Sequence, residues 1–471
     1  MFTSVNTEKN TCFCPTVRKL MIKLGPFCSR GSTFILQPSL RWTSIILWVT
    51  LCAAVPSSTQ AEKIGVDFIV EASATGGNTN PAGAVDGDRF SIRPESVWQG
   101  PSGVRECWWS VRFGSPRKVG SILQINGTGE LSLRQAPKDY RWQWSPDGIR
   151  WEDLSETHIQ DERRMFRIHR LKEPRMALGL RLLMCGRESE PPVLREVEFY
   201  PEPDSAIPFP DWAVIIFTEI KVKTPPDTPH LFVNLIRECP EWRELAFQQI
   251  CYRDVDEAFV SAEPRPLCAF LTGSGTEWCQ VPPETWRGVE EVLRGRRLPI
   301  WGACGGAQVL ALIWEHGTND RWDCPRCRDP QSPRSPVYTH IGHLGPARCG
   351  DYSQNIGERG KYQVRLVAQD PAFEGLPQVF EVMEAHYGQI AYVPNGWVQI
   401  VKKGPQGLTE NQCLRMKDRY IYAAQFHIEL PGTPENSRRI ISNFLRLAKD
   451  WGGYNPEGKE VPTPEPMVEK P

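Results

Sequence analysis

Cys304 is the residue in this 471-residue sequence whose surroundings most favour nucleophilic chemistry. It lies in LPIWGACGGAQVLALIWE, where an apolar strand ends at Gly302 and a helix begins directly after the cysteine. Gly302 and Gly306 leave room for the strained turn that lifts a nucleophile above a sheet. The positive end of the helix favours a thiolate, and the backbone N–H of Gly305 is placed to stabilise an oxyanion. The pattern predicts a nucleophile elbow, with a buried structural cysteine as the alternative.

A histidine and an acid that suit such a nucleophile occur later in the chain. The segment RYIYAAQFHIEL places His427 and Glu429 two positions apart on a predicted strand, so that both side chains lie on one face. In a cysteine-histidine mechanism the histidine takes the thiol proton and later protonates the leaving amine, while the acid fixes the histidine tautomer. We therefore expect Cys304, His427 and Glu429 to form a catalytic triad.

Two further segments accompany these motifs. FLTGSGTEW is a glycine-rich loop after a predicted strand, and EAHYGQIAYVPNGW precedes the final strands. Together with GACGGAQ and QFHIEL, they make residues 212–448 resemble the class I glutamine amidotransferases, whose patterns are Gly-x-Cys-x-Gly-x-Gln and Gln-Phe-His-Pro-Glu. Ile428 replaces the family's proline, and Ala307 replaces its usual histidine or aromatic residue; neither is the nucleophile.

The resemblance assigns roles by position. The family's thiolate attacks a γ-glutamyl amide, releases ammonia and forms a thioester that water resolves, and no cofactor is implied for this reaction. The implied oxyanion and substrate-binding residues are Gly273, Gly275, Gly305, Gln308, His386 and Tyr387. Gly273 or a neighbour would supply the second oxyanion N–H, and Gln308 with the backbone around His386 and Tyr387 would hold the γ-glutamyl group. His386 equally suits a simple backbone hydrogen bond.

The elements that must position these residues follow from periodicity. Buried-strand runs alternate with helical stretches, which indicates a parallel sheet between helices. We predict strands at Trp212–Phe217, Leu267–Leu271 and Leu298–Trp301, and helices at Glu241–Tyr252 and Pro283–Arg294. Residues 212–449 should therefore form a three-layer α/β domain with a mostly parallel sheet.

Residues 62–200 show short alternating strands broken by Gly, Pro, Asn and Asp, which is typical of a β-sandwich. EASATGG, AVDGDRFS, WWSVRFG, YRWQWSPDGIRWEDL and LREVEFY resemble the discoidin domain, also called the F5/8 type C domain. That resemblance implies a jelly roll that binds glycans or lipid head groups through loops at one end, often with a structural calcium ion. The matching calcium ligands are Asp86, Asp88 and Glu196; the alternative is a turn with solvated acids.

Two cysteines in this segment could be bonded or free, and its tryptophans could bind sugars or fill the core. Cys107 and Cys185 could form a disulfide within the sandwich if their distance allows it. Six tryptophans could stack on sugar rings, but alternating strand positions favour the core for most of them: Trp98, Trp108, Trp109, Trp142, Trp144 and Trp151.

An insertion from Trp322 to Cys349 lies outside the amidotransferase pattern. Its candidate metal ligands are Cys324, Cys327, His340, His343 and Cys349. CxxC followed by His or Cys suits a structural zinc ion, whereas an exported protein favours a disulfide-stapled loop. The loop is the favoured interpretation.

The remaining segments define the domain organisation. Residues 1–61 contain scattered basic residues, the apolar stretch Ser44–Val55 and then small and polar residues, which indicates an export signal. An uncleaved anchor or a buried strand is the alternative. Residues 201–211, PEPDSAIPFPD, form a Pro-rich linker, and residues 450–471 lack an apolar face and should be a disordered tail.

Charge and motif content narrow the function classes. The 55 Lys and Arg against 56 Asp and Glu argue against a nucleic-acid partner. No GxxxxGK[ST] phosphate loop occurs in the sequence, which favours hydrolysis over synthesis. We expect an exported hydrolase of γ-glutamyl or related amides, held near a glycan-rich surface by its discoidin module. The alternatives are a non-enzymatic surface-binding protein and an amidotransferase subunit that passes ammonia to a partner.

Overall fold

The computed structural model describes residues 62–65, 68–187, 190–278, 281–322, 337–341, 356–457 and 460–467. The expected export signal at residues 1–61 lies outside the described residues. So do four of the five candidate ligands of the insertion: Cys324, Cys327, His343 and Cys349. Export and the choice between zinc and a disulfide therefore stay predictions.

Antiparallel strands build the N-terminal domain, as the alternating pattern predicts. Their order is β2-β7-β3-β6-β4-β5, with β1 paired to β3. The strands are β1 Phe68–Ala72, β2 Trp98–Gln99, β3 Cys107–Asn126, β4 Asp139–Ser145, β5 Glu152–Asp153, β6 Phe166–Cys185 and β7 Val193–Tyr200. Two register shifts interrupt the long β3–β6 pair, and such irregularities bend strands so that they can serve both layers of a sandwich. Short 3-10 turns occupy Pro81–Val85, Pro94–Ser96 and Ser155–Thr157.

Tryptophan side chains fill the core of this domain. Trp98, Trp109 and Trp142 are fully buried. Trp109 packs edge to face on Trp142 with ring centroids 6.3 Å apart, a favoured aromatic geometry. The other three tryptophans are partly exposed: Trp108, Trp144 and Trp151. The core prediction is therefore confirmed for three of the six, and of the remainder Trp144 still packs against the same core.

Cys107 and Cys185 are free thiols, so the disulfide that the sequence allowed is absent. Cys107 is buried, and its Sγ donates a long hydrogen bond of 3.7 Å to Met184 O. Burial, together with the neighbouring Cys185, raises the pKa of Cys107 to about 12. The thiol therefore stays protonated and packs as a small apolar group.

A mixed sheet forms the centre of the C-terminal domain, and within the described residues it has nine strands in the order β15-β13-β17-β18-β19-β11-β10-β8-β9. Pairing is parallel from β9 to β19 and antiparallel from β19 to β15. The strands are β8 Trp212–Phe217, β9 Ala246–Cys251, β10 Cys268–Leu271, β11 Ile300–Ala303, β13 Glu358–Leu366, β15 Val379–His386, β17 Trp397–Lys403, β18 Asn411–Met416 and β19 Ile421–Ala424. Two small pairs lie beside it, β12 Tyr338–His340 with β16 Gly388–Ile390 and β14 Ala368–Gln369 with β20 Glu465–Pro466. The parallel part matches the predicted alternation of strand and helix, but the sheet is mixed and not mostly parallel as expected, because β13, β15, β17 and β18 pair antiparallel.

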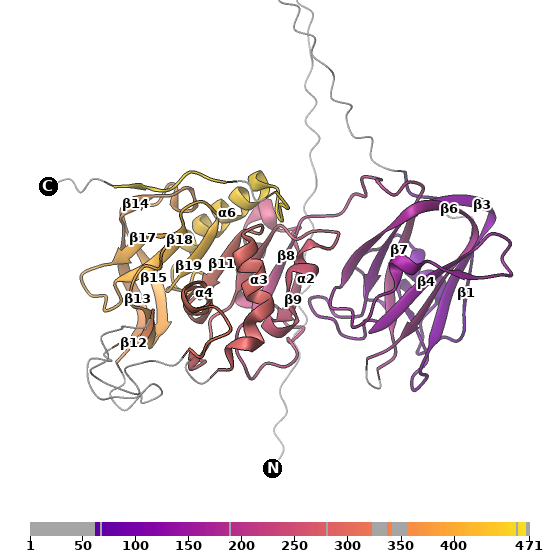
Figure 1. Ribbon diagram of the computed structural model, residues 1–471, viewed down its shortest axis with the longest axis horizontal. Coiled ribbons are helices and arrows are strands. Elements are labelled where there is room, and N and C mark those ends of the chain that lie inside the picture. The colour runs from indigo at the N-terminus through magenta and orange to yellow at the C-terminus, as the bar shows by residue number, and fades with distance from the viewer. Residues whose placement is uncertain are drawn as a thin grey trace, which may run out of the picture. The chain divides into compact units, whose positions relative to one another are not determined.

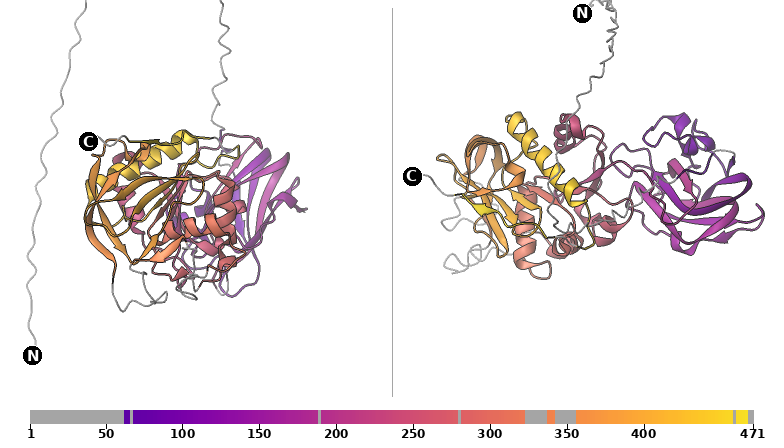
Figure 2. Two further views of the ribbon diagram at one scale, coloured as in Figure 1. Left: turned by 60° about the vertical axis from the view of Figure 1, so that its left-hand side comes forward. Right: turned by 90° about the horizontal axis from the view of Figure 1, so that it is seen from above.

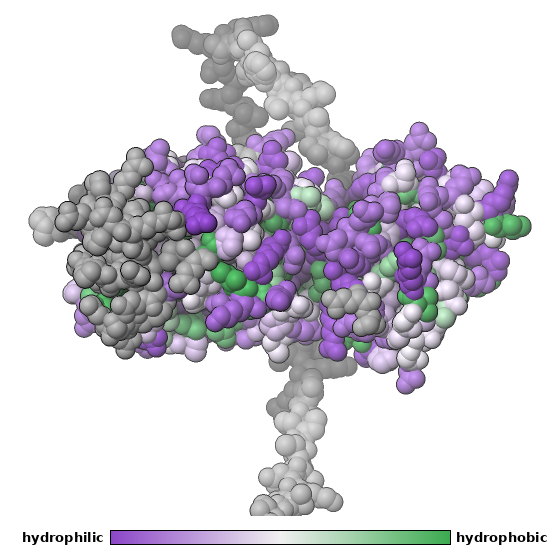
Figure 3. Space-filling view, turned by 60° about the horizontal axis from the view of Figure 1, so that its bottom comes forward, coloured by the Kyte–Doolittle hydropathy of each residue, from purple (hydrophilic) through white to green (hydrophobic). Residues whose placement is uncertain are grey.

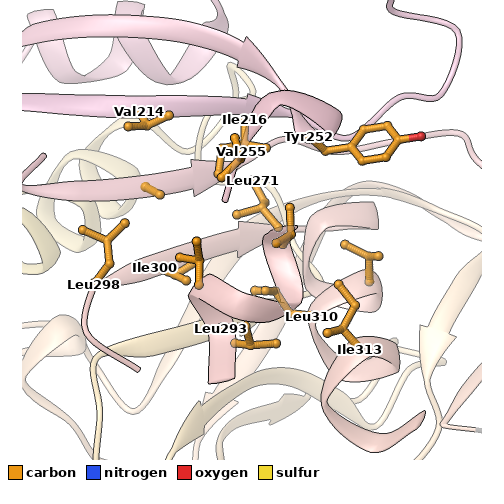
Figure 4. Packing of buried hydrophobic residues seen from close by; sticks show 14 of the residues in the cluster. Val214, Ile216, Tyr252, Val255, Leu271, Leu293, Leu298, Ile300, Leu310 and Ile313 are labelled. Carbon is orange, nitrogen blue, oxygen red and sulfur yellow. The ribbon is translucent and has the colours of Figure 1, made fainter. Parts of the chain in front are cut away.

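Helices cover both faces of this sheet (Figures 1 and 2). They are α1 Leu231–Arg237, α2 Glu257–Ser261, α3 Arg287–Gly295, α4 Gly305–His316 and α6 Pro434–Trp451. Short 3-10 turns lie at Pro240–Trp242, Tyr252–Asp254, Pro283–Trp286 and Pro371–Phe373. Val214 and Ile216 of β8 pack with the apolar residues of α3 and α4 (Figure 4), whereas Ala213 and Ile215 pack in the cluster that contains α1 and α6. Successive side chains of β8 thus point alternately to the two helical layers, which confirms the predicted three-layer arrangement.

The predicted helix Glu241–Tyr252 is wrong. After the 3-10 turn at Pro240–Trp242, the segment forms β9, which pairs in parallel with β8. Phe247 and Ile250 are three positions apart and belong to the clusters on opposite faces of the sheet. Hydrogen bonding to the open edge of β8 and burial on both faces outweigh the local helical pattern.

The expected disordered tail over residues 450–471 also differs from the structure. Helix α6 continues to Trp451, and β20 pairs with β14 further on. Arg415, which is 1 % exposed, donates a hydrogen bond of 2.5 Å to Pro462 O. Backbone pairing needs no apolar face, which is why composition did not reveal this segment.

The surface on the face drawn in Figure 3 is mostly hydrophilic, with hydrophobic residues in small groups. Such scattered apolar residues are normal for a water-exposed surface. Among the described helices, none combines the length and apolarity that a bilayer span requires.

Candidate active site

Cys304 lies in the turn between β11 and α4, where the sequence predicts it. Its φ of 50° and ψ of −111° are values that cost a non-glycine residue about 1–3 kcal/mol. Its N–H donates to Ala424 O at 2.8 Å, and its carbonyl accepts from Gln308 N at 3.0 Å. The neighbouring strand and the first turn of the helix therefore hold the strained backbone in place.

Two glycines allow β11 and α4 to meet at this turn. A Cβ on Gly302 would lie 2.7 Å from a methyl of Leu310, and a Cβ on Gly306 would lie 2.6 Å from Leu271 O. Both distances are shorter than ordinary van der Waals contacts, so neither position accepts a side chain without a shift of the backbone or core. The room that the elbow requires is thus present.

The glycine loop after β10 brings its backbone against the same turn. A Cβ on Gly273 would lie 2.8 Å from His427 Cε1 and 3.7 Å from Cys304 Cβ. A Cβ on Gly305 would lie 2.7 Å from Ser274 N. The structure therefore brings together Gly273, Gly305, Cys304 and His427, as the sequence predicts. Gly275 is less crowded, since its nearest neighbour would be Glu219 Oε2 at 3.8 Å.

His427 and Glu429 follow β19 and are almost fully buried. Nδ1 of His427 lies 2.6 Å from Oε1 of Glu429. The backbone N–H of His427 donates to Met383 O at 2.8 Å, which fixes this segment against β15. The carboxylate therefore holds the proton on Nδ1 and leaves Nε2 as the nitrogen that can exchange a proton with the thiol.

The electrostatics of this pair suit proton transfer. Burial lowers the pKa of His427, but the charge of Glu429 and the interaction with Cys304 outweigh burial and raise it well above its usual value. Burial raises the pKa of Glu429, but the charge of His427 and their hydrogen bond hold it below its usual value. A buried imidazolium-carboxylate pair beside the thiol is the result.

Gln308 adjoins the turn through its backbone, and the side chains of Gln308 and Tyr387 both have structural partners. Oε1 of Gln308 accepts from Trp278 Nε1 at 3.0 Å, and its Nε2 donates to Gln425 Oε1 at 3.2 Å. The guanidinium of Arg359 stacks over the Tyr387 ring at 4.8 Å and donates to its hydroxyl. The Gln308 amide is therefore fixed by its neighbours, and its predicted contact with substrate stays a prediction.

Glu219 was missed by the sequence interpretation. It follows β8, and its Oε2 accepts from Gly275 N at 3.1 Å and from Ser274 Oγ at 3.3 Å. The carboxylate therefore holds the glycine loop that borders Cys304. An acid just beyond the carboxyl end of a parallel strand is a signal that could have identified it.

His386 contacts two further acids that the sequence interpretation also missed. Its Nδ1 lies 2.8 Å from Gly388 O, which confirms the backbone hydrogen bond that was one alternative for this residue. Its Nε2 lies 3.1 Å from Glu358 Oε2 and 2.9 Å from Glu384 Oε2. The backbone next to it also borders the nucleophile, because Ala385 O lies 3.8 Å from Cys304 Sγ.

The three calcium candidates do not form an ion cage. Oε1 of Glu196 forms an ion pair with the ammonium of Lys63 at 3.0 Å. Its Oε2 accepts a hydrogen bond from Gly87 N at 3.2 Å. Asp86 instead accepts from the N–H of Asp88 at 2.8 Å, as in an ordinary turn. The carboxylates of Asp86, Asp88 and Glu196 are not among the groups of described residues whose ligand atoms converge within 4.8 Å. These side chains therefore do not fit calcium, which takes six to eight oxygen ligands.

Two family models match the chain. Residues 284–447 match "Glutamine amidotransferase class-I", and residues 69–196 match "F5/8 type C domain". The first range contains Cys304, His427 and Glu429, and the second contains the strands of the N-terminal domain from Ile69 to Glu196.

Individual proteins are similar over parts of the chain. GMP synthase [glutamine-hydrolyzing] of Thermosipho melanesiensis is 35 % identical over 92 residues, which cover 18 % of this chain and 17 % of that protein. GMP synthase [glutamine-hydrolyzing] of Brachyspira hyodysenteriae is 25 % identical over 193 residues, which cover 40 % of this chain and 30 % of that protein. The chain thus spans only about a sixth of the first relative and less than a third of the second.

Among solved structures, chitosan-binding module 1 of a chitosanase/glucanase from Paenibacillus sp. IK-5 matches with a TM-score of 0.24 and 20 % identity. This match covers 28 % of the present chain and 95 % of the module. The two family matches, together with the two folds, show that the chain joins an F5/8 type C domain to a class I glutamine amidotransferase domain.

Proposed function

We propose that the protein is an exported cysteine-dependent amidohydrolase that cleaves a γ-glutamyl or related amide bond through a thioester. The observation that carries this proposal is the hydrogen bond between His427 Nδ1 and the Glu429 carboxylate at 2.6 Å. This pair lies beside a cysteine that is held in a strained strand-to-helix turn. A merely structural cysteine needs neither the strain nor the oriented histidine.

In the proposed reaction, the Cys304 thiolate attacks the amide carbonyl, and the N–H groups of Gly305 and the glycine loop stabilise the oxyanion. His427 then gives its proton to the leaving amine, so that a thioester and free ammonia or amine result. Water, deprotonated by His427, attacks the thioester and releases the acid and the thiol. Glu429 keeps the histidine tautomer and orientation fixed throughout.

Ammonia release is the direct test. Purified full-length protein is incubated with L-glutamine and a panel of γ-glutamyl peptides, and ammonia or amine and the acid product are quantified. We expect Cys304→Ser to abolish release, whereas Cys239→Ser should retain it. Cys239 is a matched control because it is also a buried free thiol, and its Sγ donates to Leu235 O at 3.6 Å as a serine hydroxyl would. Equal release by wild type and Cys304→Ser would refute the proposal.

A labelling experiment separates an intact site from a wrong substrate panel. A glutamine-mimicking electrophile should modify Cys304, and mass spectrometry of the peptides identifies the labelled residue. Labelling without turnover would favour an amidotransferase subunit that needs its partner, as the similarity to glutamine-hydrolyzing GMP synthases also allows. Neither labelling nor turnover would favour the non-enzymatic alternative.

We further propose that the F5/8 type C domain binds a glycan and keeps the hydrolase at a surface. Trp108 and Trp151 are partly exposed, although Arg181 lies 4.4 Å over the Trp151 ring. Binding of the full chain to a glycan array should weaken with Trp108→Ala and stay unchanged with Trp98→Phe, which alters only the core. Export itself is tested by sequencing the N-terminus of protein recovered outside the cells.

A further inference from the structure

Glu358, Glu384 and His386 form a buried cluster that the proposed reaction does not use. Glu358 begins β13, and its register partner on β15 is His386. Glu384 lies two positions before His386 and therefore faces the same side of the sheet. Among the described residues, this is the group of His, Cys, Asp and Glu whose ligand atoms all lie within 4.8 Å of one another. The three side chains are at most 1 % exposed.

The groups around the cluster orient its atoms inward. The carbonyl of Gly388 ties down Nδ1 of His386 at 2.8 Å, which leaves Nε2 directed at the carboxylates. The N–H of Leu408 donates to Oε1 of Glu358 at 2.7 Å, while Oε2 has one long contact of 3.5 Å with Gln412. Metal-binding histidines and carboxylates are commonly held in this way through their second nitrogen or oxygen.

A hydrogen bond alone does not account for the arrangement. Nε2 of His386 is 2.9 Å and 3.1 Å from two carboxylate oxygens, and its single N–H cannot be well aligned with both of them. Neither oxygen of Glu384 has a hydrogen-bond donor within the described part of the chain. Even a protonated His386 supplies one positive charge against two buried carboxylates, and such an excess of buried negative charge is destabilising. Nitrogen and oxygen atoms about 3 Å apart are spaced as they are around a metal ion with ligand distances of about 2.0–2.2 Å.

We propose that Glu358, Glu384 and His386 bind a divalent transition-metal ion. One imidazole nitrogen and two carboxylate oxygens are ligands that zinc, iron and manganese accept, and the ion's charge would balance the two carboxylates. The ion would join β13 to β15. Because Ala385 O borders the Cys304 thiol, it would also fix the backbone that forms one wall of the site.

Metal uptake by the wild-type full chain is the first test. After dialysis against a chelator and then metal-free buffer, the protein is titrated with Co²⁺ and, in parallel, with Zn²⁺. We expect uptake of about one equivalent at this site, since three converging protein ligands hold one ion. In the Cys324→Ser/Cys327→Ser protein, the Co²⁺ form should show visible d–d bands without the near-ultraviolet thiolate band that cysteine ligands would produce. A wild-type protein that takes up neither ion would overturn the proposal and leave a proton on His386 as the balancing charge.

Variants then show whether the bound ion is held by Glu384 and His386. Glu384→Gln and His386→Gln should each lose this equivalent, whereas Glu381→Gln on the exposed side of the same strand should retain it. A double variant Cys324→Ser/Cys327→Ser should also retain it, so that a second ion in the insertion is not mistaken for this one. Retention of the full stoichiometry in both Glu384→Gln and His386→Gln would reject the assignment. If a variant of the cluster does not fold, X-ray absorption of the zinc form of the Cys324→Ser/Cys327→Ser protein decides, because only nitrogen and oxygen ligands are expected there and sulfur would contradict the site.

Discussion

Two buried histidines near Cys304, His427 and His386, differ in the partners of their two ring nitrogens. In His427, Nδ1 faces a carboxylate at 2.6 Å, and the other nitrogen is left for the thiol. In His386, Nδ1 faces the neutral carbonyl of Gly388 at 2.8 Å, and Nε2 faces two carboxylates. The same residue types therefore support proton transfer in one place and the holding of a cation in the other, because orientation rather than composition decides the chemistry.

The largest expected difference between the two histidines is in the chemical step. His427→Gln removes the base and should lower the rate of ammonia release, and of labelling of Cys304, by about 10²- to 10⁴-fold. His386→Gln should lower both rates far less, since its ring acts only through the position of β15. Stopped assays of both variants at equal protein concentration provide the measurement, with circular dichroism to confirm folding. Losses of equal size would mean that the two histidines do not have separate roles.

The crowding around His427 can be tested through the glycine loop. Gly273→Ala places a methyl 2.8 Å from His427 Cε1 and should lower the rate by about 100-fold, because small displacements of a catalytic group are costly. Gly275→Ala is the matched control, since its methyl would have no neighbour closer than 3.8 Å. Rate measurements and thermal melts of both proteins separate misplacement from unfolding. A harmless Gly273→Ala would show that the ring does not need its present position.

The His427–Glu429 pair should contribute to stability in a limited pH range. The raised pKa of His427 contributes below its usual value of 6.5, and this contribution declines as the pH rises toward the folded value. The lowered pKa of Glu429 contributes above its usual value of 4.5, and this contribution is lost as the pH falls toward its folded value. The difference in Tm between wild type and Glu429→Gln should therefore be greatest between pH 4.5 and 6.5. A difference that is constant from pH 4 to pH 9 would contradict an ionised pair.

The smallest expected effect concerns Glu219. Glu219→Gln weakens the hydrogen bond from Gly275 N, which is worth about 1 kcal/mol, so the rate should fall by only about fivefold. Because the glycine loop borders His427 and not His386, metal uptake should stay unchanged in this variant. Activity assays and Co²⁺ titrations of the same protein measure the rate and the metal uptake. A change in metal uptake without a change in rate would mean that the glycine loop acts on His386 and not on His427.

The sequence was sufficient to predict those site residues whose geometry depends on their immediate neighbours in the chain. Cys304 lies between glycines at a strand-to-helix boundary, and His427 and Glu429 are two positions apart, so each motif carries its own geometry. The Trp212–Phe217 and Pro283–Arg294 predictions were confirmed for the same reason, since burial and helical periodicity are local patterns.

Long-range pairing explains what the sequence did not show. Glu358 and His386 become neighbours only through the register of β13 on β15, and nothing in either segment specifies that register. Strand β9 was mistaken for a helix because its partner β8 lies about thirty residues away in the chain. Lys63 reaches Glu196 across the N-terminal domain, so this ion pair was equally hidden in the sequence.

The pairing of β20 with β14 makes the stability of the C-terminal domain depend on a short segment that follows the last helix. The segment Pro462–Met467 helps to line a cavity of about 610 Å³ and supplies the carbonyl of Pro462 to the buried guanidinium of Arg415. Removal of this segment would open the cavity and leave a buried donor without its acceptor, at a cost of about 1–3 kcal/mol. A variant that lacks residues 462–467 would therefore melt earlier while keeping every residue of the candidate active site.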